Sequence, residues 1–327
     1  MTIKRRLLRI LLILLLLPPF LAAVAGWLIA PNFVHPIRNP FSPIDVKVAD
    51  NTFSFIAAHR EDFDVRAPDG VLLRGWKVRP QNPNGSWVLV FHGVADNRMG
   101  VIEHACMLLR AGYSVVMMDA RAHGASAGSL ATYGWLERND TRAIIDALLV
   151  SEQAGPGLAL RESTARPFHL FALGESMGAG IALQSAAVDP RIEAVVAEAS
   201  FATLREASYD YAGLRRYPSL GKTLFAPFSW TLLYRGEKLA GLPVAEVSPM
   251  EAVASRAFPV LLICDEKDEA LPCRHTKIIY DAAIGPKQMW VVPGAFHTAA
   301  LGYQPAEFRR RVPDFFGAIA SPSTSPH

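Results

Sequence analysis

The sequence predicts an α/β protein in which helices cover both faces of a mostly parallel β-sheet. From about residue 87 to residue 318, short apolar runs alternate with helical patterns, an order typical of consecutive strand–helix units. Several runs, such as residues 115–118, are apolar throughout, as expected for strands buried on both faces of a parallel sheet. Because 51% of the 327 residues are hydrophobic, the chain can bury a large core.

The predicted strands are short apolar runs at residues 61–67, 71–78, 87–91, 113–118, 168–173, 192–197, 258–263 and 287–292. The predicted helices lie at residues 98–110, 136–149, 177–188, 274–283 and 305–318. The first two strands flank the turn signal Pro68-Asp69-Gly70, so we expect them to form a hairpin.

The alternation stops between residues 201 and 257. This stretch is too long for an ordinary loop, and it is rich in aromatic residues and helical patterns. We interpret it as a helical lid inserted between two strands of the sheet.

The N-terminal segment, residues 1–30, has the composition of a membrane anchor. Residues 10–30 form a stretch of 21 residues without a charge, preceded by Lys4, Arg5, Arg6 and Arg9. A helix rises about 1.5 Å per residue, so this stretch can cross a hydrocarbon core of about 30 Å. Basic residues stay on the cytoplasmic side, which predicts a single-pass protein whose main domain lies on the non-cytoplasmic side.

A cleaved signal peptide is the alternative interpretation of the same segment. The small residues Ala23, Val24 and Ala25 could serve as a cleavage site, which would leave a secreted or periplasmic protein. After this segment, residues 31–60 contain four prolines and are predicted to be a linker. The main domain is expected at residues 61–320, followed by a polar tail at residues 321–327.

Composition argues against several other classes of protein. The net charge is only +3, and the basic residues are spread along the chain, so nothing indicates a nucleic-acid partner. The three cysteines, Cys106, Cys264 and Cys273, fit no metal or redox spacing and are expected to be small buried residues. A Cys264–Cys273 disulfide is possible in an oxidising compartment, but the spacing alone does not decide it.

A candidate nucleophile lies between a predicted strand and a predicted helix. Residues 174–178 match G-x-S-x-G, with Ser176 at the turn from the strand 168–173 to the helix 177–188. Such a turn is strained, and side chains at Gly174 and Gly178 would clash there. The helix N-terminus places free N–H groups and partial positive charge beside the serine, which favours a developing oxyanion.

A serine nucleophile needs a general base, and His297 is the best candidate for it. This histidine follows the strand 287–292, at the edge of the sheet where sites form. His275 and His169 lie within a predicted helix and a predicted strand and are less suitable. The acid that orients the histidine is expected after the strand 258–263, where Asp268 is favoured and Asp265 is the alternative.

Two backbone N–H groups are expected to form an oxyanion hole. One belongs to Met177, next to the nucleophile, and the other to Val94, in the loop after the strand 87–91. Gly93 allows the backbone to approach closely, and we expect His92 to orient this loop.

Together these residues resemble the α/β-hydrolase superfamily over roughly residues 60–320. Within it, the chain looks most like membrane-anchored serine hydrolases with a short N-terminal hydrophobic segment. The stretch from Asp119 to Gly128 is similar to the D-x-R-G-x-G-x-S-x-G turn after the fourth strand of that family, in which the turn is structural. The resemblance implies the α/β-hydrolase fold and a catalytic triad of Ser176, Asp268 and His297.

The predicted activity is cleavage of a carboxylic ester or thioester through an acyl-enzyme, without a metal or an organic cofactor. The aromatic lid and the anchor favour a small-molecule or lipid ester, including fatty-acyl substrates. The alternatives are an acyltransferase that uses the same triad and a non-catalytic, membrane-bound interaction protein. The sequence does not indicate the oligomeric state.

Overall fold

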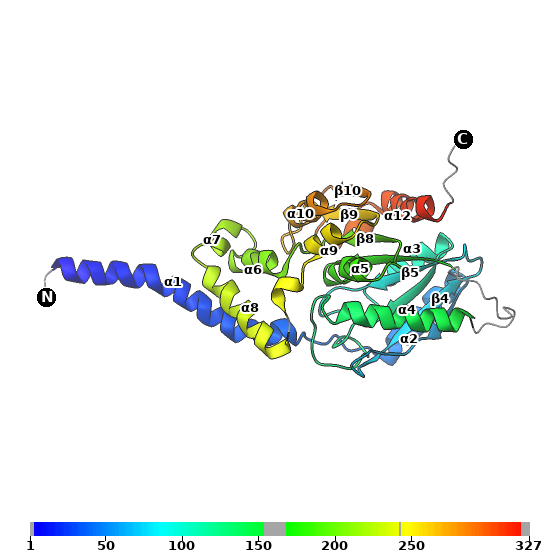
Figure 1. Ribbon diagram of the computed structural model, residues 1–327, viewed down its shortest axis with the longest axis horizontal. Helices are drawn as coiled ribbons and strands as arrows, with labels where there is room; N and C mark the ends of the chain where they lie inside the picture. Colours follow the sequence, from blue (N-terminus) through cyan, green and yellow to red (C-terminus); the bar gives the residue numbers. More distant parts are fainter. Residues whose placement is uncertain (1–2, 154–167, 242, 322–327) are drawn as a thin grey trace.

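The computed structural model describes residues 3–153, 168–241 and 243–321. Its centre is an eight-stranded sheet in the order β1-β4-β6-β5-β7-β8-β9-β10 (Figure 1). The strands are β1 (Ala58–Asp62), β4 (Gly75–Pro80), β5 (Ser86–Phe91), β6 (Ser114–Met118), β7 (His169–Glu175), β8 (Ala194–Glu198), β9 (Val260–Asp265) and β10 (Lys287–Val292). Strand β4 is antiparallel to both of its neighbours, and the other five pairings are parallel. The predicted mostly parallel sheet is therefore confirmed.

Helices cover the sheet on both faces, as predicted. One face packs against α2 (Pro43–Phe55), α3 (Ile102–Arg110) and α12 (Pro305–Ala320), and the other against α4 (Glu137–Gln153), α5 (Met177–Val188), α9 (Pro249–Ser255) and α10 (Arg274–Ala282). In β6, Val115 and Met117 pack into the core on the face covered by α2, α3 and α12, whereas Val116 and Met118 pack into the core on the opposite face. Successive side chains of a strand point to opposite faces, which is why this run is apolar throughout.

Each of the two predicted hairpin strands consists of two shorter strands in the structure. The turn at Pro68-Asp69-Gly70 joins β2 (Val65–Arg66) to β3 (Leu72–Leu73), which form a separate two-stranded antiparallel sheet. The longer flanking strands, β1 and β4, pair with each other in the main sheet. The single strands predicted at residues 61–67 and 71–78 are therefore each broken in two.

The prediction of a linker at residues 31–60 was wrong. Helix α1 (Ile3–Val34) continues past residue 30, and α2 and most of β1 occupy the remainder of the segment. Ser42 begins α2 with a capping box that includes Asp45, and Pro43 stands at its first position. Phe53 of α2 is buried with its ring edge against Trp76, so this helix is part of the core. Of the four prolines, Pro31 lies within α1, Pro43 begins α2, and Pro36 and Pro40 lie in the short irregular stretch between the two helices.

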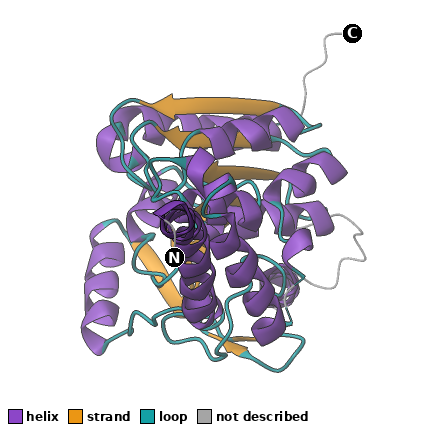
Figure 2. Ribbon diagram, turned by 90° about the vertical axis from the view of Figure 1, so that its left-hand side faces the viewer, coloured by secondary structure: helices purple, strands orange, loops and turns teal. Residues whose placement is uncertain are grey.

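The predicted insertion between β8 and β9 contains helices, as expected from its sequence. These are α6 (Leu204–Ala212), α7 (Pro218–Lys222), α8 (Ala226–Ala240), a 3₁₀ turn (Val244–Glu246) and α9. Helix α9 packs against α5 and α10 on the sheet, whereas α6, α7 and α8 form a separate layer. We call these three helices the lid. Figure 2, viewed from the side toward which α1 projects, shows α1 and the lid in front of the sheet.

The two ends of the chain differ in what the structure describes. Helix α1 runs through Pro18 and Pro19 without interruption and is long and apolar enough to cross a membrane. Much of it extends away from the domain (Figure 1). At the other end, α12 ends at Ala320, and residues 322–327 of the predicted tail lie outside the described residues.

Candidate active site

Ser176 lies at the sharp turn between β7 and α5, as the sequence predicted. Its backbone has φ 52° and ψ −118°, a conformation that residues other than glycine rarely adopt. A Cβ at Gly174 would overlap the carbonyl oxygen of Gly178, and a Cβ at Gly178 would overlap that of Phe91. Gly174 therefore allows β7 and α5 to approach closely enough to form the turn, and Gly178 allows α5 to approach the end of β5.

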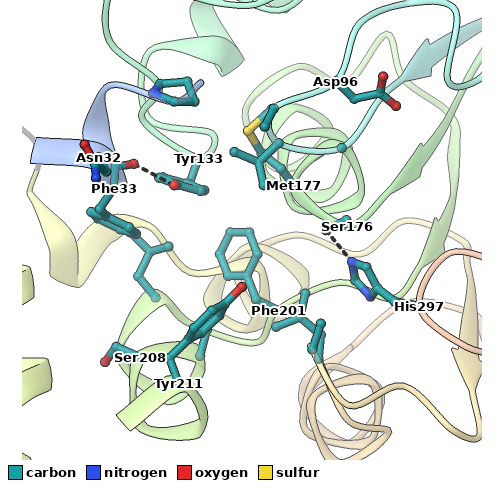
Figure 3. A pocket seen from close by; sticks show the side chains of 18 of the residues that line it. Asn32, Phe33, Asp96, Tyr133, Ser176, Met177, Phe201, Ser208, Tyr211 and His297 are labelled. Carbon is teal, nitrogen blue, oxygen red and sulfur yellow. Dashed lines mark hydrogen bonds between the residues drawn. The ribbon is translucent and has the colours of Figure 1, made fainter. Parts of the chain in front are cut away.

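Ser176, His297 and Asp268 form one hydrogen-bonded chain. The His297 Nε2 atom lies 2.9 Å from the Ser176 Oγ, and its Nδ1 atom lies 2.6 Å from the Asp268 Oδ2 (Figure 3 shows the serine–histidine bond). A carboxylate only accepts hydrogen bonds, so Nδ1 carries the proton and Nε2 accepts from the serine hydroxyl. This tautomer is the one that a general base requires.

The loop after β9 holds Asp268 rigidly. The second carboxylate oxygen of Asp268 accepts hydrogen bonds from the backbone N–H groups of Ala270 and Leu271, at 2.7 and 2.8 Å. The side chain is buried, and both of its oxygens have partners. These bonds fix the orientation of the carboxylate toward the histidine.

Asp265, the alternative acid, has a different partner. Its Oδ2 accepts from the backbone N–H of Thr298 at 2.8 Å, next to His297 but not from the imidazole ring. Burial, with the nearby Glu198, raises the pKa of Asp265 to about 8. The geometry therefore favours Asp268 as the partner of His297 and gives Asp265 the position of a support for the histidine loop.

The loop after β5 approaches Ser176 from the other side of the turn. Gly93, Val94 and Met177 line the cavity in front of the serine, which is where the predicted oxyanion donors should lie. His92 is buried, accepts from the Ala120 N–H at 3.0 Å through Nε2, and contacts the Gly93 carbonyl through Nδ1. Burial lowers the pKa of His92, which suits a neutral ring that makes both bonds. These bonds match the expected orienting role of His92.

The turn from Asp119 to Gly128 also behaves as a structural element. Asp119 accepts from the backbone N–H groups of Arg98 and Ala125, at 2.8 and 2.7 Å. Arg121 is buried and forms an ion pair with Asp140 at 2.6 Å. Its charge is thus satisfied within the fold.

Three buried ionisable groups behind the nucleophile were missed by sequence reasoning. Glu175, next to Ser176, is buried, and this burial raises its pKa to about 7. Glu198 on β8 accepts from the Ala300 N–H at 2.9 Å and lies 3.6 Å from the Nε2 of His104 on α3. Glu175 is visible in the G-x-S-x-G pattern, but its burial and its neighbours depend on the packing of distant elements.

A cavity of about 720 Å³ opens in front of Ser176. Its wall is mostly apolar and includes the end of α1, the loop after β5, residues of α6 and α8, and the His297 loop, together with Tyr133, Phe201, Ala270 and Leu271. Figure 3 shows Phe33, Tyr133, Phe201 and Tyr211 around the space that leads to Ser176. A concave apolar site with a few polar groups at one end is typical of a small-molecule site.

The contact between His275 and Asp210 and the bond between Cys264 and Cys273 link elements next to the site. His275 is buried and contacts Asp210 of α6 at 2.6 Å, which ties the lid to α10 and explains this histidine without a catalytic role. Cys264 and Cys273 form a disulfide around the loop that carries Asp268. Cys106 is buried with a free thiol, as expected.

Comparison with known proteins agrees with this fold. A family described as serine aminopeptidase, S33, a hydrolase family, matches residues 82–239. The uncharacterized protein YqkD of Bacillus subtilis is 26% identical over 265 residues, covering 80% of this chain and 81% of its own. The uncharacterized protein YfhR of Escherichia coli K12 is 25% identical over 269 residues, covering 80% of this chain and 82% of its own.

Solved structures share the architecture at low sequence identity. The Pyrococcus furiosus esterase Pf2001 aligns with TM-score 0.62 and 22% identity, over 82% of this chain and 96% of its own. A Pyrococcus horikoshii acylaminoacyl peptidase aligns with TM-score 0.60 and 14% identity, over 83% of this chain and 43% of its own. The chain therefore shares the α/β-hydrolase fold with these esterases and peptidases, and residues 82–239 are similar to a hydrolase family.

Proposed function

We propose that this protein is a serine hydrolase that cleaves carboxylic esters or thioesters through an acyl-enzyme. The observation that carries the proposal is the Ser176–His297–Asp268 hydrogen-bonded chain, with the serine on a strained turn at the end of an apolar cavity. The apolar wall supports an ester with an apolar acyl group rather than a charged peptide.

In the proposed reaction, His297 accepts the Ser176 proton while Oγ attacks the ester carbonyl carbon. The backbone N–H groups of Val94 and Met177 stabilise the oxyanion. The bond to the alcohol then breaks, and His297 passes the proton to the departing oxygen. Water repeats the sequence, breaks the acyl–serine bond and releases the carboxylic acid. Asp268 keeps the imidazole oriented and stabilises its charged form.

The proposed location is a single-pass membrane protein with the main domain on the non-cytoplasmic side. The basic residues before the apolar stretch of α1 support this orientation, and so does the disulfide between Cys264 and Cys273. Release after cleavage near Ala25 is the alternative.

The test is fluorophosphonate labelling of the full-length protein in detergent, together with turnover of short-chain nitrophenyl esters. We expect wild type to be labelled, Ser176→Ala to lose the label, and Ser176→Ala and His297→Ala to lose at least about 10³-fold in kcat. Folded wild-type protein that is neither labelled nor active would favour the interaction-protein alternative. Transfer of the acyl group to an added alcohol in preference to water would identify an acyltransferase.

A further inference from the structure

The end of α1 forms part of the wall of the Ser176 cavity. Ile29, Phe33 and Ile37 line the cavity together with residues of α6 and α8. The Phe33 ring stacks on Tyr133 with centroids 4.7 Å apart, and the Tyr133 hydroxyl donates to the Phe33 carbonyl at 2.7 Å (Figure 3). A simple membrane anchor would need none of these contacts with the site.

Hydrogen bonds to backbone carbonyl groups fix this end of α1 to the main domain. The Ala131 N–H donates to the Val34 carbonyl at 2.9 Å. Just after the helix, the Arg38 guanidinium donates to the carbonyls of Gly124 and Gly128, at 3.0 and 2.9 Å. The position of α1 relative to the cavity is therefore set by the fold.

The lid packs directly on the apolar part of α1. The Thr231 hydroxyl of α8 donates to the Ala23 carbonyl at 2.7 Å. At Gly26, an added Cβ would overlap the carbonyl oxygen of Phe228, so the two helix backbones are in close contact. Small residues and backbone-directed hydroxyls are typical of helix pairs within membranes.

These contacts define the depth of the lid relative to a membrane. The uncharged stretch of α1 covers residues 10–30, and α8 makes its contacts there at Ala23, Gly26 and Trp27. At about 1.5 Å per residue, the contact covers roughly the last 10 Å of a crossing of about 30 Å. If residues 10–30 span the hydrocarbon core, the lid lies at the level of one leaflet, on the side of the main domain.

The outer surface of the lid suits this depth. Among the exposed apolar and aromatic residues of the lid helices and the loops that join them are Leu214, Tyr217, Leu220, Leu224, Trp230 and Tyr234, which we call the rim. Tyrosine and tryptophan are enriched where a membrane meets water. Between Leu204 and Ala240 there are six basic and three acidic residues, so this segment carries a net positive charge. Figure 1 shows the lid beside α1, on the side of the sheet toward which α1 projects.

We propose that the lid is embedded in this leaflet and that the acyl chain of a bilayer ester lipid enters the cavity directly from the hydrocarbon, between α1, α6 and α8. The carbonyl carbon then lies at Ser176, while Phe33, Phe228 and Leu232 contact the chain. This inference rests on the proposed function, names its substrate class, and makes α1 a part of the substrate site.

The test compares two substrates on full-length protein reconstituted in phospholipid vesicles. One is a fluorescent long-chain glycerolipid in the bilayer, and the other is a short-chain, water-soluble nitrophenyl ester. The rim double variant Leu220→Glu with Leu224→Glu should lower the ratio of lipid to soluble-ester turnover at least tenfold. The matched control is Val150→Glu with Ile284→Glu, which changes two exposed apolar residues away from the lid and should leave the ratio unchanged.

A second variant tests the wall formed by α1. Ile29→Trp should lower the preference for long over short acyl chains at least tenfold, because the larger side chain fills the chain-binding end of the cavity. Ile13→Trp, on the part of α1 outside the cavity, is its control. An unchanged chain-length profile in Ile29→Trp would overturn the role of α1 in the site.

Failure of the inference can be distinguished from failure of the proposed function. If wild type neither cleaves the soluble ester nor reacts with fluorophosphonate at Ser176, the hydrolase proposal fails. If both reactions occur but the rim variant keeps the wild-type ratio, only the lipid proposal is overturned. A rim variant that keeps this ratio but converts an oligomer into a monomer would identify the rim as a contact between copies of the chain.

Discussion

At the scale of single residues, the two aspartates after β9 differ in what they contact. Asp268 is bonded to the imidazole of His297, whereas Asp265 accepts from the backbone N–H of Thr298. Asp265 ends β9, Asp268 follows three residues later, and both are buried, so their order in the sequence does not separate them. Their hydrogen-bond partners distinguish the two aspartates, and substitution of each can measure the difference in their effect on kcat.

We expect Asp268→Asn to lower kcat by about 10³- to 10⁴-fold, because an amide in this place favours the wrong imidazole tautomer. The kcat of Asp265→Asn should stay within about tenfold of the wild-type value. The amide oxygen can still accept from the Thr298 N–H, and the native carboxyl, with its raised pKa, carries little charge at neutral pH. Ester turnover of the two variants checks this. Equal losses would instead make Asp265 a second essential acid.

Glu175 should make the stability of the protein depend on pH. Burial raises its pKa from 4.5 to about 7, so between these values the folded protein holds a proton that the unfolded chain has released. The stability contributed by this protonated group is therefore lost as pH rises through this window, by at most about 3 kcal/mol. The unfolding temperature of Glu175→Gln should equal that of wild type near pH 4.5 and exceed it at pH 8.

Thermal unfolding of both proteins across this pH range is the measurement. Glu103→Gln, which changes an exposed glutamate on α3, is the matched control. Parallel curves for wild type and Glu175→Gln would mean that the pKa of Glu175 is the same in the folded and the unfolded protein.

At the scale of elements, α2 shows how a proline-rich segment can belong to the core. Phe53 is 1% exposed and lies with its ring edge toward Trp76, whereas Phe55, two residues further on, is 86% exposed. One helix thus offers a buried and an exposed phenylalanine, whose removal should have different effects.

Phe53→Ala should lower the free energy of unfolding by about 3–5 kcal/mol, because it removes a buried ring and leaves a cavity. Phe55→Ala removes the same atoms from the surface and should change stability by less than about 0.5 kcal/mol. Denaturant unfolding in detergent measures both. A small effect of Phe53→Ala would restore the interpretation of residues 31–60 as a linker.

At the scale of the whole molecule, the disulfide and the orientation in the membrane depend on each other. A bond between Cys264 and Cys273 persists in an oxidising compartment and is rare in the cytosol. It closes a short loop around Asp268, and the chain-entropy estimate for a loop of this size is about 3 kcal/mol. The bond and the basic residues before α1 support the same side of the membrane.

We therefore expect a reporter enzyme that is active only outside the cytoplasm to be active when fused after His327. The two cysteines should resist alkylation in intact cells until a reductant is added, and reduction should lower the unfolding temperature. Cys106, which has a free buried thiol, should react only after denaturation. A silent reporter together with freely alkylated Cys264 and Cys273 would place the domain in the cytoplasm.

The sequence by itself determined the features that depend on local chemistry and periodicity. Alternating apolar runs and helical patterns predicted the sheet with helices on both faces, because strand and helix periods are written in neighbouring residues. The pattern around Ser176 predicted the strained turn, because Gly174 is needed for the close approach of β7 and α5, and Gly178 for that of α5 and β5. The length and polarity of residues 10–30 predicted an apolar helix able to span a membrane.

Only the tertiary structure decided what depends on contacts between distant parts of the chain. It paired His297 with Asp268, buried Glu175 behind the nucleophile, and brought the end of α1 against the cavity. It also showed that α2 packs into the core despite its surrounding prolines. No local pattern contains this information, because burial and hydrogen-bond partners arise only when the sheet brings remote loops to one edge.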